Sequence, residues 1–393
     1  MRTNGLEIAD IFREYGHAFR KIYPVPTYYT KVMNLIVCCR SAALGSHTER
    51  CNECGYERVA YNSCRNRHCP KCQYTEREKW IIKRENELLP VPYYHIVFTI
   101  PDLLNKIVLV NKQIMYDLLF RAASETLLVL GKDEKHLGAE IGLIAVLHTW
   151  GQNLMDHPHL HCIVPGGGLI RNKARWVLSK KAKYNEFFIH VNIISDLFKK
   201  KFLYYFKKVY KSEELKFTGS IKYLSTPEMF HELLNVLYKK KWISYCKRPF
   251  GGPEQVLEYL GRYTHRVAIT NSRIKRIENG HVIFEWKDYR KGNEKKEMAL
   301  SPVEFIRRFM LHILPEGFFK IRYYGILSSR NKKKALAQCR EILAPKEDIP
   351  INQTANKVRT ELIQTEVTIR DIKKCPQCKT GMMGCINVAI RAA

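Results

Sequence analysis

The sequence predicts an α+β protein in which a helical, cysteine-rich N-terminal part precedes a larger part made of strands and helices. Three observations predict this class. Short β-branched and aromatic runs alternate with longer stretches of helical pattern. Cys-x-x-Cys pairs are concentrated between residues 51 and 72. With 393 residues, of which 46% are hydrophobic, the chain is long enough for one large domain or two to three smaller ones.

The expected elements follow the chain in order. Helix-forming sequence covers residues 8–45, and a charged helix over residues 76–89 ends at a proline-rich break. We expect strands over residues 93–100, 141–149, 160–164 and 281–286. We expect further helices over residues 103–130, 192–210, 227–245 and 302–314. From residue 330 onward we expect looser structure.

Two Cys-x-x-Cys pairs predict a zinc site in the N-terminal part. Cys51 and Cys54 are separated from Cys69 and Cys72 by 14 residues, slightly less than the usual gap in a four-cysteine zinc ribbon. The turn inside each pair brings both sulfurs to one side, so that they can bind the same tetrahedral ion. Thirteen cysteines, clustered in this way, fit reduced thiolates that hold metal better than they fit disulfides.

Further cysteines and histidines leave the number of zinc ions open. Cys64, His68 and His47 are additional candidate ligands, and together with the two pairs they are too many for one tetrahedral ion. One or two zinc ions are therefore possible. A later group, Cys375 and Cys378 with Cys385, has no fourth ligand nearby in the sequence and indicates at most half of a zinc knuckle.

His159 and His161 are candidate ligands of a divalent cation, and the alternative is an ordinary strand with half-exposed imidazoles. The residues around them alternate with period 2, as in a strand, so both imidazoles point to the same face. Such a cation usually takes a third protein ligand. His157 has the same parity, but positions four apart on a strand span about 13 Å, so it reaches the ion only if the chain bends at Pro158. The other candidates are Gln152, His148 and His95.

Tyr259 and Tyr263 are candidate nucleophiles, and the alternative is a helix whose tyrosines pack in the core. Their surroundings suit a helix, in which residues four apart lie on one face with Cβ atoms about 5–6 Å apart. A phenol with a pKa near about 10 is a poor nucleophile unless a cation or an arginine stabilises the phenolate. Arg262 and Arg266 are near enough in sequence to do this. Mg²⁺ or Mn²⁺ would stabilise charge on a phosphate, and Mn²⁺ is better matched to imidazole ligands.

The charge of the chain favours a nucleic-acid partner. Sixty-six Lys and Arg residues against 38 Asp and Glu residues give a net charge of +28, which favours phosphate contacts and counterion release. Arg65, Arg67 and Lys71, next to the cysteines, and Arg322 are the expected DNA contacts. A ribosomal-type or merely basic protein is the alternative.

Other classes of protein are disfavoured. No apolar run approaches the roughly 20 residues that cross a bilayer, and no leader opens the chain, so we expect a cytoplasmic, nucleoid-associated protein without a membrane partner. No glycine-rich phosphate loop is found, so we expect no nucleotide cofactor and no attached ATPase.

Several motifs in the same order resemble the two-tyrosine HUH transposases of the insertion-sequence-ninety-one family. The resemblance covers roughly residues 10 to 330, without departure at the histidine pair or the tyrosine pair. The matching motifs lie at residues 61–73, 93–99, 147–153, 157–169, 259–266, 312–318 and 321–325. The resemblance implies three regions: a helical and zinc-binding DNA-binding domain over residues 1–89, an HUH nuclease domain over 90–330 and a basic tail over 331–393.

The resemblance also implies a fold and an activity. The HUH endonuclease core is an antiparallel sheet flanked by helices. The activity that the resemblance implies is nicking and rejoining of single-stranded DNA through 5′-phosphotyrosine intermediates in rolling-circle-like transposition. A plasmid or phage replication initiator or relaxase of the HUH class, and a non-catalytic zinc-finger DNA-binding protein, are the alternatives. The zinc module in front of the nuclease core favours the transposase.

Overall fold

A computed structural model describes the chain over residues 5–85, 87–178, 189–247, 261, 267–288, 292, 294–344 and 374–389. The chain divides into two compact units, and neither is continuous in sequence. The cysteine-rich unit comprises Met1–Asn86, His265–Met310 and Pro345–Ala393. The sheet unit comprises Glu87–Thr264 and Leu311–Ala344. Antiparallel sheets and helices make up both units, which confirms the predicted α+β class.

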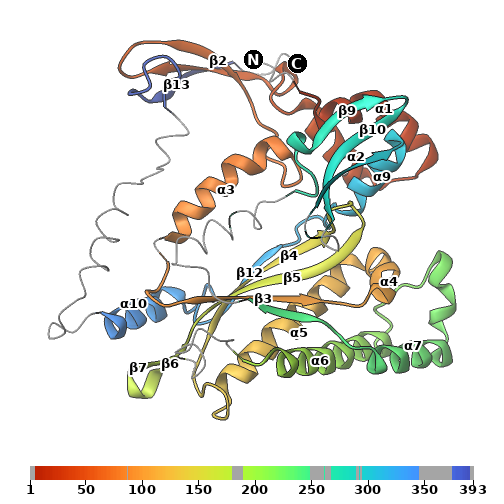
Figure 1. Cartoon of the computed structure of the whole chain (residues 1–393). Helices are drawn as coiled ribbons and strands as arrows, with labels where there is room; N and C mark the ends of the chain where they lie inside the picture. The colour runs from red at the N-terminus through yellow and green to blue at the C-terminus, as the bar shows by residue number, and fades with distance from the viewer. Residues whose placement is uncertain are drawn as a thin grey trace. The chain divides into compact units, whose positions relative to one another are not determined.

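Helices form the core of the cysteine-rich unit. They are α1 (Ile8–Ile22), α2 (Thr27–Cys38), α3 (Pro70–Glu85) and α9 (Pro302–Leu311). Helix α1 is amphipathic and buries one face, on which Phe12 meets Phe309 of α9 edge-to-face with ring centroids 5.2 Å apart. Beside it, α2 packs close to α1 (Figure 1). The helices predicted within residues 8–45 are therefore confirmed.

Two three-stranded antiparallel sheets complete this unit. In the first, β1 (Ser46–Cys51) lies between β2 (Glu57–Tyr61) and the C-terminal strand β13 (Met383–Ala389). The second has the order β11-β10-β9 and is formed by β9 (Ile274–Glu278), β10 (His281–Asp288) and β11 (Glu294–Leu300). The pairing of β13 with β1 brings residues near the two ends of the chain into one sheet.

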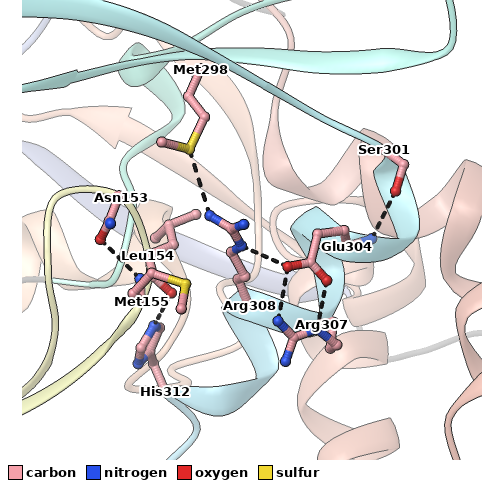
Figure 2. A network of polar contacts seen from close by, with 9 residues as sticks. All are labelled: Asn153, Leu154, Met155, Met298, Ser301, Glu304, Arg307, Arg308 and His312. Atoms are coloured by element: carbon pink, nitrogen blue, oxygen red, sulfur yellow. Dashed lines mark hydrogen bonds and ion pairs between the residues drawn. The ribbon is translucent and has the colours of Figure 1, made fainter. Parts of the chain in front are cut away.

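A network of charges holds α9 against β11. Glu304 accepts hydrogen bonds from Arg307 at 2.6 and 2.8 Å and from Arg308 at 2.7 Å (Figure 2). Arg307, and after it Arg308, lowers the pKa of Glu304 to about 2. Arg308 also reaches Met298 of β11, with 3.6 Å between Nη1 and Sδ. These contacts fix the rotation of the helix against the strand.

The sheet unit is built on a five-stranded antiparallel sheet with the order β12-β4-β5-β3-β8. Its strands are β3 (Tyr93–Thr99), β4 (Gly142–Trp150), β5 (Asp156–Pro165), β8 (Ser244–Lys247) and β12 (Ile321–Gly325). A small hairpin follows β5 and consists of β6 (Gly168–Ile170) and β7 (Arg175–Val177).

Helices cover one face of this sheet. They are α4 (Asn105–Val110), α5 (Lys112–Lys132), α6 (Val191–Lys211) and α7 (Pro227–Lys239), and α5 and α6 run alongside each other beneath the strands (Figure 1). Phe98 of β3 and Leu160 of β5 are buried under them with Phe198 of α6. Complete burial of each such side chain contributes about 1.5–3 kcal/mol. Because strand side chains alternate, the residues between these point to the opposite face.

Several elements differ from the sequence expectation. Strand β5 begins at Asp156 rather than at residue 160, and α7 ends at Lys239, after which the chain forms β8. The expectation of looser structure after residue 330 is wrong where the chain is described. There α10 (Lys332–Leu343) buries Ala335 and Leu336 in the sheet unit, and β13 joins a sheet.

Short 3-10 helices connect the longer elements. They are η1 (Ala42–Leu44), η2 (Asp102–Leu104), η3 (Arg171–Lys173), η5 (Gly219–Ser225) and η6 (Asn271–Arg273). Among the helices of the described ranges, none is both long enough and apolar enough to span a bilayer.

Candidate metal centres

Three histidines on neighbouring strands converge on the face of the sheet opposite the helices. His159 and His161 are two apart on β5, and His148 of β4 pairs with His159. Alternation therefore places all three imidazoles on one face. One ring nitrogen of each lies within 4.8 Å of the other two. This spacing allows a single divalent cation to bind all three rings.

Hydrogen bonds orient two of these rings. Nδ1 of His159 lies 2.6 Å from the backbone oxygen of His157. Because a carbonyl oxygen only accepts, Nδ1 carries the proton and Nε2 has the lone pair that a cation needs. Nδ1 of His161 lies 2.8 Å from Nε2 of the buried His95. A protonated Nδ1 of His161 donates to His95, which leaves Nε2 of His161 as the nitrogen for the cation.

The three rings differ in accessibility. His148 and His161 are buried, with 2% and 7% of their surface exposed, whereas His159 is half-buried. Trp150 stacks on His148 with ring centroids 4.8 Å apart. This stacking shields one side of His148. The accessible edge of the cluster is therefore the one formed by His159 and the exposed His157.

A buried histidine fixes the turn between β4 and β5. Nε2 of His312 donates to the backbone oxygen of Leu154 at 3.0 Å (Figure 2). Its Nδ1 then accepts from the Thr149 hydroxyl at 3.2 Å, which is the pattern of a neutral imidazole. Burial lowers the pKa of His312 to about 4, so this tautomer persists at neutral pH. Leu154 has a left-handed backbone with φ 61°, and the bond to His312 helps to hold it there.

The third histidine of the converging group lies on the neighbouring strand β4. The group of converging nitrogens contains His148 and leaves out His157, whose ring centroid lies 5.0 Å from that of His159. His157 contributes its backbone oxygen instead. Gln152 lies in the turn between β4 and β5, and a ligand role for it stays a prediction. His95 takes a supporting position through its bond to His161.

The predicted nucleophiles lie outside the described residues. Tyr259, Tyr263, Arg262 and Arg266 all belong to a part of the chain whose structure is not described. Their roles therefore stay predictions from the sequence.

The cysteines form two separate four-sulfur clusters in the cysteine-rich unit. The first joins Cys39, Cys64, Cys69 and Cys72, and the second joins Cys51, Cys54, Cys375 and Cys378. In the first, Sγ of Cys72 lies 3.5 Å from that of Cys39 and 3.6 Å from that of Cys64. Tetrahedral zinc with Zn–S bonds of about 2.3 Å requires sulfur separations of about 3.8 Å. Both clusters thus have the composition and spacing of structural zinc sites.

These clusters correct the ligand sets expected from the sequence. The pair Cys51 and Cys54 does not share a site with Cys69 and Cys72. Cys51 and Cys54 lie at the turn of hairpin β1–β2, and strand β2 then leads the chain away from them toward Cys69 and Cys72. Neither cluster includes His68 or His47, and Nδ1 of His47 is 2.9 Å from Oδ1 of Asn62.

Cys39 is a ligand candidate that the sequence reasoning missed. It caps the C-terminus of α2, and 98% of its surface is buried. Cys69 and Cys72 meet it from the N-terminus of α3, where the helix dipole favours thiolates. The Cys-Arg dipeptide at Cys39 and Cys64 also occurs at Cys339, outside both clusters, so this local pattern did not distinguish Cys39 as a ligand.

The residue after a cluster cysteine repeatedly has a left-handed backbone. Arg40, Arg65 and Lys379 have φ values of 56°, 51° and 61°, and Gly55 has 70°. They follow Cys39, Cys64, Cys378 and Cys54, respectively. This conformation costs a non-glycine residue roughly 1–2 kcal/mol and persists where the surroundings enforce it. Both clusters therefore share the backbone turn of a metal knuckle.

The basic residues chosen from the sequence have different surroundings. Arg65 is exposed, whereas Lys71 forms an ion pair with Glu7 at 2.6 Å. Arg322 is bound to Asp117 and lies over the rings of Phe120 and Phe318, at 4.2 and 5.0 Å from their centroids. By strand alternation Arg322 is on the helix-covered face, away from the histidines. This position favours a structural role for Arg322. Arg67 is half-buried next to the first cluster.

Fold and sites together define a basic, zinc-binding α+β protein with a three-histidine candidate cation site. Two family models match it. One, described as "Transposase zinc-binding domain", matches residues 11–100, and the other, described as "Putative transposase", matches residues 142–335. The second match contains all three converging histidines.

Curated relatives are similar over most of their lengths. The chain is 47% identical to "Putative transposase y4qJ" of Sinorhizobium fredii (strain NBRC 101917 / NGR234) over 389 residues, which are 99% of this chain and 96% of that protein. It is 25% identical to "Transposase for insertion sequence element IS801" of Pseudomonas savastanoi pv. phaseolicola over 301 residues, covering 75% of this chain and 69% of that protein. No solved structure gives a significant match. The chain belongs to this family of transposases with a zinc-binding domain.

Proposed function

We propose that this transposase nicks and rejoins single-stranded DNA at the three-histidine site, through 5′-phosphotyrosine intermediates of the HUH type. The observation that carries the proposal is the convergence of His148, His159 and His161 on one face of the sheet. Three neutral imidazoles at one point are suited to holding a divalent cation next to a phosphate. Membership of a transposase family supports DNA as the substrate and favours transposition over replication initiation or simple regulation.

A cation at this site would polarise the scissile phosphate and stabilise its developing charge. Mn²⁺ fits the site better than Mg²⁺, because Mg²⁺ prefers oxygen ligands and the converging groups are imidazoles. Bonds from Nδ1 to the His157 oxygen and to His95 would keep two of the rings in the binding orientation. The accessible edge at His159 gives a DNA strand a route to the cation.

Tyr259 and Tyr263 are the proposed nucleophiles. The phenolic oxygen of one tyrosine attacks phosphorus, an O–P bond forms, and the bond to the 3′ oxygen breaks. The 3′ oxygen leaves as a hydroxyl once it takes up a proton. The 5′-phosphotyrosine keeps the energy of the phosphodiester, so rejoining needs no ATP. Two tyrosines allow one covalent link for each of two strand ends, and Arg262 and Arg266 are proposed to stabilise the phenolate.

Single-stranded DNA is the proposed substrate, and the net charge of +28 supports strong phosphate contacts. The test uses end-labelled single-stranded DNA that spans the ends of the element encoding this chain. Incubation with Mn²⁺ should give a protein-linked band on a denaturing gel, and chelation should abolish it. Replacement of both Tyr259 and Tyr263 by Phe should remove the band, while Tyr223→Phe, at an exposed tyrosine of η5, should keep it. A band that survives the double replacement would exclude these nucleophiles.

A further inference from the structure

The C-terminal pair Cys375 and Cys378 belongs to a complete four-sulfur cluster. Its partners are Cys51 and Cys54 at the end of β1 and in the turn after it. Sγ of Cys51 lies 3.7 Å from Sγ of Cys378, and Sγ of Cys54 lies 3.6 Å from Sγ of Cys375. Both distances are close to the separation of about 3.8 Å that tetrahedral zinc imposes. All of these cysteines are reduced.

The two halves of this cluster have matching backbones. The residue after the second cysteine is left-handed in both, Gly55 with φ 70° and Lys379 with φ 61°. A backbone N–H donates to a cluster sulfur in both halves, from Glu53 to Cys51 at 3.5 Å and from Gly381 to Cys378 at 3.3 Å. Such bonds stabilise a thiolate more than a thiol, and thiolates are the form that binds zinc.

Direct hydrogen bonds join the two halves. The Asn52 backbone N–H donates to the oxygen of Met382 at 3.1 Å, and the Met382 N–H donates to Oδ1 of Asn52 at 2.6 Å. Gly381 lies so close that a Cβ there would be 2.4 Å from Sγ of Cys51. The two turns are thus fitted to each other around the sulfurs.

The apolar core around this cluster is very small. Among the described residues it consists of Cys51, Cys375 and Met383, with Tyr56 and Cys378 packed against them. Cores of this size are generally too small to hold a module together, and natural modules of this kind rely on a metal or disulfides. The pairing of β13 with β1 therefore needs another source of stability, which a bound ion would supply.

We propose that a second Zn²⁺ ion, held by Cys51, Cys54, Cys375 and Cys378, joins the C-terminal segment 374–389 to the N-terminal zinc-binding domain. The matched zinc-binding domain ends at residue 100, so this site extends it with ligands from the other end of the chain. The inference goes beyond DNA cleavage and does not depend on it. It predicts two zinc ions per chain, one in each cysteine cluster.

Zinc content of the purified full-length protein, measured by elemental analysis, tests the proposal. The unaltered protein should hold two zinc ions. Replacement of both Cys375 and Cys378 by Ser should leave one, and so should replacement of both Cys51 and Cys54. Replacement of all four should also leave one, because the two pairs hold the same ion. Cys385→Ser is the matched control and should keep two, because Cys385 lies on β13 outside both clusters.

Two further variants keep every thiol, and they distinguish a weakened zinc site from a misfolded protein. Gly381→Ala should speed zinc release to a chelator by about tenfold or more for one of the two ions, because its Cβ meets the Cys51 sulfur. Gly384→Ala on β13 should leave the release unchanged, since the nearest atom to its Cβ is 3.9 Å away. Equal release rates in the two variants, or two zinc ions retained without Cys375 and Cys378, would overturn the proposal.

Cleavage of the chain gives an independent test. A protease site inserted between Gln353 and Thr354 allows the C-terminal fragment to be cut from the folded protein. The fragment should co-elute with the remainder on gel filtration and should separate when a zinc chelator is added. Separation without a chelator would show that no ion joins the two ends.

Discussion

Nε2 of His95 lies 2.8 Å from Nδ1 of His161, and the two ring planes are nearly parallel, with an interplanar angle of 6°. His95 is on β3 and His161 on β5, so the bond crosses between neighbouring strands of the sheet. His95 thereby fixes the orientation of a ring that belongs to the candidate cation site. A residue placed in this way acts through its neighbour, and it is a positioning residue.

His95→Ala should weaken Mn²⁺ binding by about 10- to 100-fold, the usual effect of removing a partner that orients a metal-ligating histidine. Calorimetric titration of Mn²⁺ measures the change. DNA cleavage should recover at high Mn²⁺ concentration, which distinguishes His95 from a direct ligand. His231→Ala, at an exposed histidine of α7, is the control and should bind Mn²⁺ normally. An unchanged Mn²⁺ affinity in His95→Ala would show that His95 does not position His161 for binding.

His148→Ala and His157→Ala discriminate between the ligand set of the structure and that of the sequence. His148 contributes a nitrogen to the converging group, and His157 does not. The first variant should therefore lose Mn²⁺ binding and covalent DNA attachment, while the second should keep most of both, because its backbone oxygen is unaffected. Thermal unfolding of both variants serves as the folding control. The opposite ranking would restore His157 as the third ligand.

The stability of the sheet unit should fall in mild acid because of His312. Its pKa is about 4 in the folded protein, against 6.5 for an ordinary histidine. The unfolded chain therefore binds more protons between these values, so stability is highest above pH 6.5 and is lost as the pH falls toward 4. The shift corresponds to a loss on the order of 3 kcal/mol.

Urea unfolding of the native protein and of His312→Gln, at neutral and at mildly acidic pH, measures this loss. The variant should be less stable at neutral pH by roughly 1–3 kcal/mol, because the Leu154 oxygen and the Thr149 hydroxyl lose their imidazole partner. Its stability should also depend less steeply on pH. If the stabilities of the two proteins changed equally with pH, His312 would not be the source of the pH dependence. Lys112 is the neighbouring charge that opposes protonation of His312, so it contributes to the low pKa.

Arg65 combines a strained backbone with an exposed side chain, and a substitution can separate the two. Arg65→Gly should stabilise the folded unit by up to about 1 kcal/mol, because relief of roughly 1–2 kcal/mol of left-handed strain exceeds the roughly 0.5–1 kcal/mol of extra backbone entropy that glycine loses on folding. If Arg65 contacts a phosphate, the same change should weaken DNA binding and reduce the salt dependence by about one charge. Arg65→Lys keeps the charge and should bind DNA with the original salt slope. An unchanged slope in Arg65→Gly would exclude the phosphate contact.

Local patterns in the sequence were enough for the class and for parts of each site. The period-2 pattern at His159 and His161 placed two imidazoles on one face, because strand geometry is a property of consecutive residues. In the same way, Cys-x-x-Cys turns indicated zinc, since each turn brings its own two sulfurs together. Strand β3 and helices α1 and α2 also followed from local patterns. The excess of basic residues also indicated a nucleic-acid partner, and this inference required no knowledge of the fold.

Only the tertiary structure decided how these pieces combine. His148 becomes the third member of the histidine group because β4 pairs with β5 in one particular register. Cys54 meets Cys375 across 321 positions of the chain, and Cys39 joins the first cluster from the end of a helix. Partners so far apart have no common local period, because their proximity results from strand pairing and packing of the whole unit. The sequence therefore indicated most of the residues that could bind metal, and the fold determined which of them converge.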